Sequence, residues 1–171
     1  ASLVFCWDTH LTKIKGRNVL FIVNASNRYT IAMTDIEPRN WNYYTMYIRG
    51  VIHGVMQEMG YSEDQIGQYF KMSGDTTVTK THGRKSVGGI NRMVMDAQYF
   101  GKKLEKEAKY QWELSEYLNR DICQPEGFDA YGYPSELFKL DMERLGIATK
   151  RKPAKVIDFA QYIENNRGTN D

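Results

Sequence analysis

The stretch RNVLFIVNASNRYTIAMT, residues 17–34, decides the fold class of this chain. Val19 to Val23 form an uninterrupted apolar run, which is typical of a central strand buried on both faces. Turn-forming residues 24–27 follow it, and residues 28–34 then alternate in polarity as a neighbouring strand does. Residues 3–9 (LVFCWDT) predict a strand before this pair. Strands joined by such short connections favour an antiparallel meander.

A fourth strand and two helices are expected next along the chain. Pro38 indicates a helix start, and apolar residues at helical spacing form a stripe that ends before Gly60. Ser62 and Gln65 have the spacing of a capping box for a second, short helix. The alternating threonines of residues 76–81 then predict the fourth strand. The members of the stripe are Ile48, Val51, Ile52, Val55, Met56 and Met59.

The second half of the chain has a helical pattern. Helices are expected over residues 86–104 and 105–120, from Ser135 to Gly146, and after Pro153. We therefore predict an α+β fold with a mostly antiparallel sheet of about four strands packed by helices. We divide it into an α+β domain over 1–105 and a helical extension over 106–171, with a flexible C-terminal tail.

Composition narrows the class of protein. The 171 residues are 42% apolar and 26% charged, as is ordinary for a soluble globular chain, and their net charge is only +2. The apolar runs are too short to span a bilayer, so we expect a cytoplasmic protein. Cys6 and Cys123 are predicted to be free thiols of a reducing compartment. The histidines at positions 10, 53 and 82 lack the spacing of a metal site, so we expect no metal and no cofactor.

The segment from Thr79 to Asn91 carries the clearest sign of a binding site. A basic turn leads into a probable helix, and the free N–H groups of a helix start favour an anion. Asn24, Asn27 and Arg28 come from the turn between two strands, and we expect strand ends to meet there in one polar patch. Arginine and asparagine side chains in such a patch bind a phosphate, a carboxylate or protein backbone. The predicted binding residues are Asn24, Asn27, Arg28, Lys80, His82, Arg84 and Asn91.

The alternative interpretation of this patch is structural: the asparagines satisfy turn backbone, and Arg28 pairs with Asp35 or Asp75. A separate possibility is contact with nucleic acid through basic side chains. The residues considered for that contact are Lys85, Lys150, Arg151 and Lys152.

An ordered set of motifs resembles an uncharacterised bacterial family, a domain of unknown function found in Firmicutes chromosomes, plasmids and prophages. The motifs are Trp7 with His10, Asn24-x-x-Asn27-Arg28-Tyr29-Thr30, Thr79-Lys80-Thr81-His82-x-Arg84, and Gly89-x-Asn91. The resemblance covers about residues 3–100 and implies a shared fold and site location. Family members usually have Trp-His at the first motif, where this chain has Trp7-Asp8.

Three functions remain open at this point. The first is a non-catalytic binding protein of phage or mobile-element type, acting stoichiometrically on a nuclease or nucleoprotein partner. An anti-CRISPR inhibitor of a type II CRISPR nuclease is the case that this context suggests. Tyrosine and tryptophan cluster in residues 41–47, 110–112 and 128–133, and interfaces favour these side chains; the alternative is that most of them pack in the core with the hydroxyl at the surface. The others are an enzyme acting on a phosphorylated or nucleotide substrate through His82, Arg84 and Asn24, and a direct nucleic-acid binder.

Overall fold

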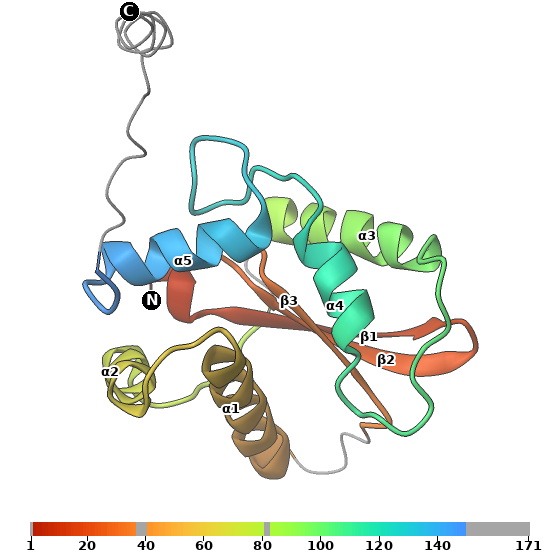
Figure 1. Cartoon of the computed structure of the whole chain (residues 1–171), viewed down its shortest axis with the longest axis horizontal. Helices are drawn as coiled ribbons and strands as arrows, with labels where there is room; N and C mark the ends of the chain where they lie inside the picture. The colour runs from red at the N-terminus through yellow and green to blue at the C-terminus, as the bar shows by residue number, and fades with distance from the viewer. Residues whose placement is uncertain (1, 37–40, 81–82, 150–171) are drawn as a thin grey trace, which may run out of the picture.

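The computed structural model describes residues 2–36, 41–80 and 83–149. A three-stranded antiparallel sheet lies at its centre, with helices on both faces (Figure 1). The strands β1 (Trp7–Ile14), β2 (Arg17–Asn24) and β3 (Thr30–Thr34) follow one another in the sheet as they do in the chain. The predicted α+β class and antiparallel meander are confirmed.

The central strand β2 is buried on both faces, as its apolar run predicts. Leu20 and Ile22 face one hydrophobic core, whereas Val19, Phe21 and Val23 face a second core on the other side of the sheet. All five side chains are buried. Burying alternate residues in two different cores requires a continuous apolar run.

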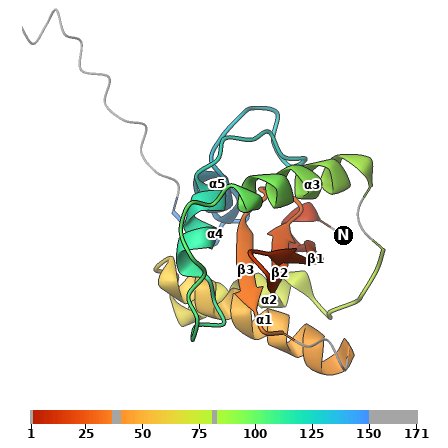
Figure 2. The ribbon, with the colours of Figure 1, turned by 90° about the vertical axis from the view of Figure 1, so that its right-hand side faces the viewer.

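Helices α1 (Trp41–Glu58) and α2 (Glu63–Ser73) cover the first face of the sheet, on the side opposite α3 (Figure 2). The predicted stripe of α1 packs there, with Ile52, Val55 and Met56 buried. The capping box of α2 is present, because Ser62 and Gln65 bond each other's backbone N–H groups. Helix α5 (Pro134–Arg144) adds Phe138 and Met142 to the same core.

Helices α3 (Arg84–Gln98) and α4 (Trp112–Asn119) form the second core. Ile90, Met93 and Ala97 of α3 pack with Leu114 and Leu118 of α4 against the sheet. Residues after 105 therefore contribute directly to the main core of the protein.

The outer edge of β3 is covered by the segment that carries α4. Thr30 exchanges hydrogen bonds with the Asn119 amide, and the Ala32 N–H donates to Ser115 Oγ at 3.0 Å. The Gln111 N–H donates to the Ala32 carbonyl at 2.9 Å, and the Thr34 N–H donates to the Lys109 carbonyl at 2.7 Å. An edge bonded in this way offers no template for pairing with another chain.

Two predicted strands differ from the structure. Residues 76–80 are extended but belong to no strand, so the expected fourth strand is wrong over these residues; Thr81 lies outside the described part. A cavity separates this segment from β1. Residues 3–5 form a 3-10 turn, and β1 begins only at Trp7, because the Val4 carbonyl is held by Asn24 Nδ2 and the Tyr69 hydroxyl.

The predicted helix over 105–120 is correct only in its second half. Residues 109–111 bond the edge of β3, and the buried Gln111 amide donates to the Glu105 and Ala108 carbonyls while accepting from the Glu105 N–H. These bonds occupy backbone N–H and carbonyl groups that a helix over residues 105–111 would need for its own hydrogen bonds. The predicted helix after Pro153 lies outside the described residues.

None of the helices in the described part of the chain combines the length and the apolar character needed to cross a bilayer.

Candidate functional site

Arg28 closes the turn between β2 and β3 in a left-handed backbone conformation, with φ of 60°. The Asn24 carboxamide oxygen accepts from the N–H groups of Ser26 and Asn27, and the Arg28 N–H donates to the Asn24 carbonyl at 2.9 Å. This turn geometry favours glycine or asparagine at its last position, because a Cβ is strained at positive φ. Arg28 therefore adopts a backbone conformation that is unfavourable for a residue with a side chain.

Gly89 of α3 makes room for the Arg28 side chain. A Cβ built on Gly89 would lie 2.7 Å from one guanidinium nitrogen of Arg28 and 2.8 Å from its central carbon. Glycine inside a helix costs about 1 kcal/mol relative to alanine. Two locally unfavourable residues, one in the turn and one in the helix, thus place this guanidinium against α3.

The guanidinium opens into a cavity of about 220 Å³, which we call the arginine pocket. Gly89, Arg92, Met93 and Asp96 of α3 form one wall, and their spacing puts them on a single helix face. Neither Arg28 nor Arg92 forms an ion pair with any residue that the structure describes. The pocket is lined by Arg28, Thr30, Gly89, Arg92, Met93, Asp96, Leu118, Asp121, Ile122, Cys123, Gln124, Tyr131 and Pro134.

Two carboxyl groups, those of Asp96 and Asp121, also line this pocket. Partial burial raises the pKa of Asp96, and its hydrogen bond with Asp121 together with the charge of that residue raises it further, whereas Arg92 opposes the shift. Two carboxyl groups in contact share a proton more readily than they both ionise. Asp96 therefore holds a proton more tightly than an isolated aspartate does.

Cys123 lines the same pocket as a free, buried thiol. Burial raises its pKa, although the charges of Arg28 and Arg92 act in the opposite direction. A thiol with a raised pKa is a poor nucleophile, because the thiolate is the reactive form.

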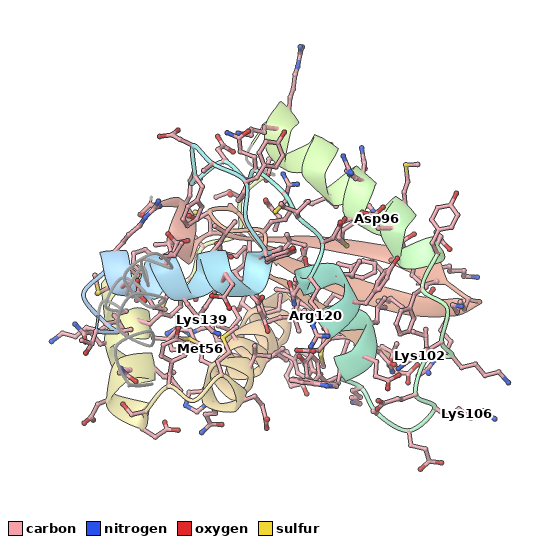
Figure 3. The ribbon with its side chains drawn as sticks, turned by 45° about the horizontal axis from the view of Figure 1, so that its top comes forward. Met56, Asp96, Lys102, Lys106, Arg120 and Lys139 are labelled. Atoms are coloured by element: carbon pink, nitrogen blue, oxygen red, sulfur yellow. The ribbon has the colours of Figure 1, made fainter. Side chains whose placement is uncertain are left out.

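A wider groove of about 630 Å³ continues from the arginine pocket between α3 and α4. The two cavities share Arg92, Asp96, Leu118 and Asp121. Figure 3 labels Asp96 on α3, Lys102 on the segment after it and Arg120 at the end of α4, which all line the groove. Phe100, Trp112 and Tyr117 add aromatic surface to the groove.

The two predicted asparagines support the turn from inside the protein. Asn24 is 1% exposed and Asn27 is fully buried. The Asn24 amide donates to the Val4 carbonyl, while Asn27 donates to the Asp141 carboxylate at 2.9 Å and accepts from the Tyr29 N–H. These bonds match the structural interpretation of the asparagines, but Arg28 does not pair as that interpretation expects, since Asp35 pairs with Arg17.

The predicted cations and Asn91 lie on or beside α3. Lys80, Arg84, Lys85 and Asn91 are exposed. Only Lys85 approaches the turn, where it lines a small void of about 10 Å³ with Asn24 and Arg28. His82, Lys150, Arg151 and Lys152 lie outside the described residues.

Sequence reasoning missed most of the arginine pocket. The spacing of Gly89, Arg92 and Asp96 was a readable signal, since it places a cation and a carboxylate on the helix face that carries the glycine. Asp121, Cys123 and Tyr131 follow α4 in irregular segments and carry no such periodic signal. In the described ranges, no group of three ligating side chains is arranged to hold a metal ion.

The model of the family described as a domain of unknown function, DUF6933, matches residues 1–137. The chain belongs to the DUF6933 family. The predicted membership of an uncharacterised family is thus confirmed, and the match extends beyond residue 100 to include α4 and the start of α5. Every residue that lines the arginine pocket falls inside the DUF6933 range. No curated protein and no solved structure matches the chain.

Proposed function

We propose that the protein is a non-catalytic binding protein, and that the arginine pocket recognises an anionic group of its partner, a phosphate or a carboxylate. The observation that carries this proposal is the placement of the Arg28 guanidinium by a left-handed arginine and a helical glycine. Backbone strain of this kind is concentrated at functional sites. A planar guanidinium offers paired donors that fit a carboxylate or phosphate bidentately.

The charges around the pocket support an anionic ligand. Arg28 and Arg92 have no ion-pair partner among the described residues, and burial together with Asp121 raises the pKa of the neighbouring Asp96. The pocket therefore offers two arginine charges to an anion, and protonation of Asp96 on acidification would strengthen that attraction.

The aromatic surface around the pocket supports a macromolecular partner. Tyr99 is 78% exposed and Tyr131 is 70% exposed, and Trp112, Tyr117 and Tyr133 are also exposed. Trp112 and Tyr117 line the groove, and Tyr131 lines the arginine pocket. Exposed tyrosine, tryptophan and arginine side chains are enriched at protein interfaces.

Anion binding is tested by nuclear magnetic resonance with sulfate and inorganic phosphate as probes. Titration is expected to shift the side-chain N–H signals of Arg28 and Arg92 to saturation. Arg28→Gly and Gly89→Ala should each abolish the saturable shift, because one removes the guanidinium and the other displaces it. Arg84→Ala, which removes an exposed arginine of the same helix outside the pocket, serves as the matched control and should titrate as wild type. Shifts that never saturate, or that survive in Arg28→Gly, would contradict the proposal.

A nuclease or nucleoprotein partner belongs to the same proposal, with a type II CRISPR nuclease loaded with guide RNA as the first one to assay. One equivalent of protein is expected to stop DNA cleavage, and Arg28→Gly should require an excess. Inhibition by a hundredth of an equivalent would mean turnover and would contradict a stoichiometric binder. Full cleavage in the presence of excess protein would remove this nuclease as the partner.

A second candidate is an enzyme acting on a phosphorylated or nucleotide substrate. The Asp96–Asp121 pair beside two arginines favours it, because a carboxyl pair can accept and return a proton. The side chain of Asn24, expected earlier to act with His82 and Arg84, is engaged in internal bonds, so the chemistry would move to the arginine pocket. Phosphate release from a panel of nucleoside phosphates, lost in Asp96→Asn, would establish this function in place of binding alone.

Direct nucleic-acid binding through Lys85, Lys150, Arg151 and Lys152 stays a prediction. Its test is the dependence of affinity on salt, because neutralising phosphates releases counterions and makes affinity fall steeply as salt is added. Affinity that does not change with salt would exclude it.

A further inference from the structure

The two outer edges of the sheet differ in how their backbone groups are bonded. The β3 edge is occupied along its length by residues 109–119, as described above. At the β1 edge, the outward carbonyl of Lys13 accepts a hydrogen bond from Gln98 Nε2 at 3.2 Å. Trp7, Thr9 and Leu11 have no backbone partner outside β2 among the described residues.

The register shows which groups of β1 point outward. The Ala25 N–H donates to the Cys6 carbonyl, so the following alternate residues, Asp8 and His10, direct their backbone groups toward β2. Backbone direction alternates along a strand in an antiparallel pair. The N–H and carbonyl groups of Trp7, Thr9 and Leu11 therefore point away from the sheet.

A second extended segment lies across a cavity from this edge. In Figure 2 the chain after α2 runs past the side of the sheet opposite α4 and continues to α3. Residues 76–80 of this segment are exposed and make no backbone–backbone hydrogen bond with any described residue. Arg49 anchors the start of the segment through Gly74 and Thr76.

The cavity between the two segments has a volume of about 280 Å³ and an aromatic floor. Trp7, Asp8 and Thr9 line one side, and residues 74–79 line the other. Its floor is formed by Phe5, Tyr44, Ile48, Ile52, Tyr69 and Phe70. The cavity is slightly smaller than the 300–1,000 Å³ typical of pockets for whole small ligands, and suits an inserted side chain.

Positive charge flanks this cavity where the segment reaches α3. Lys80, Arg84 and Lys85 are exposed and form no ion pair with the described residues. No acidic residue lies in the first turn of α3, and its N-cap, Gly83, contributes no side-chain cap. Ser86 donates to the Asp8 carboxylate at 2.6 Å, which joins the start of α3 to the β1 edge.

We propose that the β1 edge, residues 76–80 and the aromatic cavity between them form a docking site for an extended acidic peptide of a partner protein. The peptide backbone adds as a strand to the outward groups of Trp7, Thr9 and Leu11, which is a common mode of peptide recognition. One aromatic or large aliphatic side chain of the peptide fills the cavity. Its acidic side chains lie near Lys80, Arg84 and Lys85. The floor of this cavity is on the other face of the sheet from the arginine pocket, and the proposal does not depend on that pocket.

The probe is a display library of extended peptides selected on the full-length wild-type protein. Selected sequences are expected to share an aromatic or large aliphatic residue, with acidic residues toward one end. Thr9→Pro removes an outward N–H at a position where an edge strand tolerates proline. It should weaken binding of the selected peptides by at least about fivefold, since a hydrogen bond of about 1 kcal/mol is lost.

Three controls separate the possible outcomes. Thr9→Val keeps the N–H but loses the hydroxyl that bonds Tyr44, so it should weaken binding less than Thr9→Pro does, whereas Lys80→Glu combined with Arg84→Glu should weaken acidic peptides. Arg28→Gly should bind these peptides as wild type, so failure of the arginine pocket and failure of this site are distinguishable. No enrichment, or selected peptides that bind Thr9→Pro as tightly as wild type, overturns the proposal. Concentration-dependent dimerisation that Thr9→Pro abolishes would assign the edge to a second copy of the chain instead.

Discussion

At the scale of single residues, Arg28 shows how a binding group is placed at the expense of local stability. Its left-handed backbone favours glycine, and its neighbour Gly89 leaves a helix without a side chain on the face that the guanidinium covers. Glycine at position 28 would be locally more stable than arginine, and a residue with a side chain at position 89 would be locally more stable than glycine. Stability and binding should therefore respond in opposite directions when Arg28 is changed.

We expect Arg28→Gly to raise the free energy of unfolding by about 0.5 kcal/mol, because glycine accepts positive φ without a Cβ clash. The same variant should lose saturable sulfate binding. Arg28→Ala is the matched control, since it also lacks the guanidinium but keeps the strained Cβ, and it should show no gain in stability. Urea unfolding of the three proteins measures the difference. A loss of stability in Arg28→Gly would show that packing of the arginine side chain outweighs the strain.

A second prediction at this scale concerns the effect of Asp96 on the free energy of unfolding. Its pKa in the folded protein is raised above the ordinary value of 3.8, first by burial and then by Asp121. Protonation therefore favours the folded state: this contribution is complete below pH 3.8 and is lost as the pH rises through the raised folded value. Asp96→Asn should stabilise the protein at neutral pH by only about 0.5 kcal/mol, because solvent screens this partly exposed group. The substitution should have little effect under more acidic conditions.

The same group should make anion binding depend on pH. When the carboxyl pair gains its proton on acidification, the pocket loses one negative charge and Arg28 and Arg92 attract an anion more strongly. Sulfate is a suitable probe because it keeps its charge over this range. Wild-type affinity for sulfate should rise as the pH falls through the raised pKa of Asp96, and Asp96→Asn should flatten that rise. A wild-type affinity independent of pH would count against the carboxyl pair facing the ligand.

At the scale of elements, the segment carrying α4 acts as the partner of β3 without being a strand. Side chains of Ser115 and Asn119 take the place of a neighbouring backbone, and Tyr110 forms an isolated bridge with Met33. The β1 edge has no equivalent cover in the described part of the chain. This asymmetry is why we assign docking to β1.

We expect Asn119→Ala to lower the free energy of unfolding by about 2–3 kcal/mol, because it leaves the N–H and the carbonyl of Thr30 without partners in a buried environment. Ser115→Ala removes one such bond and should cost about half as much. Amide hydrogen exchange should show faster exchange at Thr30 in the first variant and at Ala32 in the second. Unchanged exchange at these two amides would mean that water or a shifted backbone replaces the lost bonds.

At the scale of the whole molecule, two hydrophobic cores on opposite faces of β2 depend on helices from both halves of the chain. Leu114 and Leu118 complete the second core, and Phe138 and Met142 complete the first. A chain that ends after residue 105 should therefore expose the β3 edge and both cores. We expect it to unfold non-cooperatively and to aggregate.

The matched control keeps every residue but cuts the chain. A protease site inserted at the exposed residues 101–103 should allow cleavage while both pieces stay associated. Circular dichroism and size-exclusion chromatography compare the two proteins. Cooperative unfolding of the chain ending at residue 105 would show that residues 1–105 form an independent domain, as the sequence analysis divided it.

Sequence alone determined the parts of this protein that local periodicity and turn chemistry specify. Sequence correctly predicted the buried strand β2 and the packed face of α1, because apolar residues repeat at the period of each element. It also predicted the capping box at Ser62, which depends only on local spacing. Arg28 was predicted as a binding residue because it stands in a turn between two strands, and the structure places it in the lining of the arginine pocket. Membership of an uncharacterised family followed from the ordered motifs.

Only the tertiary structure decided where extended segments pair and which side chains share a pocket. Threonine alternation made residues 76–80 resemble a strand, yet pairing needs a neighbour at the right distance, and a cavity lies between them and β1. Residues 108–111 bond the edge of β3 instead of forming a helix, since that edge has no neighbouring strand to satisfy its backbone groups. Arg28, Asp96 and Asp121 meet although they are distant in sequence, since contact between them depends on how α3 and α4 pack on the sheet, which no local pattern encodes.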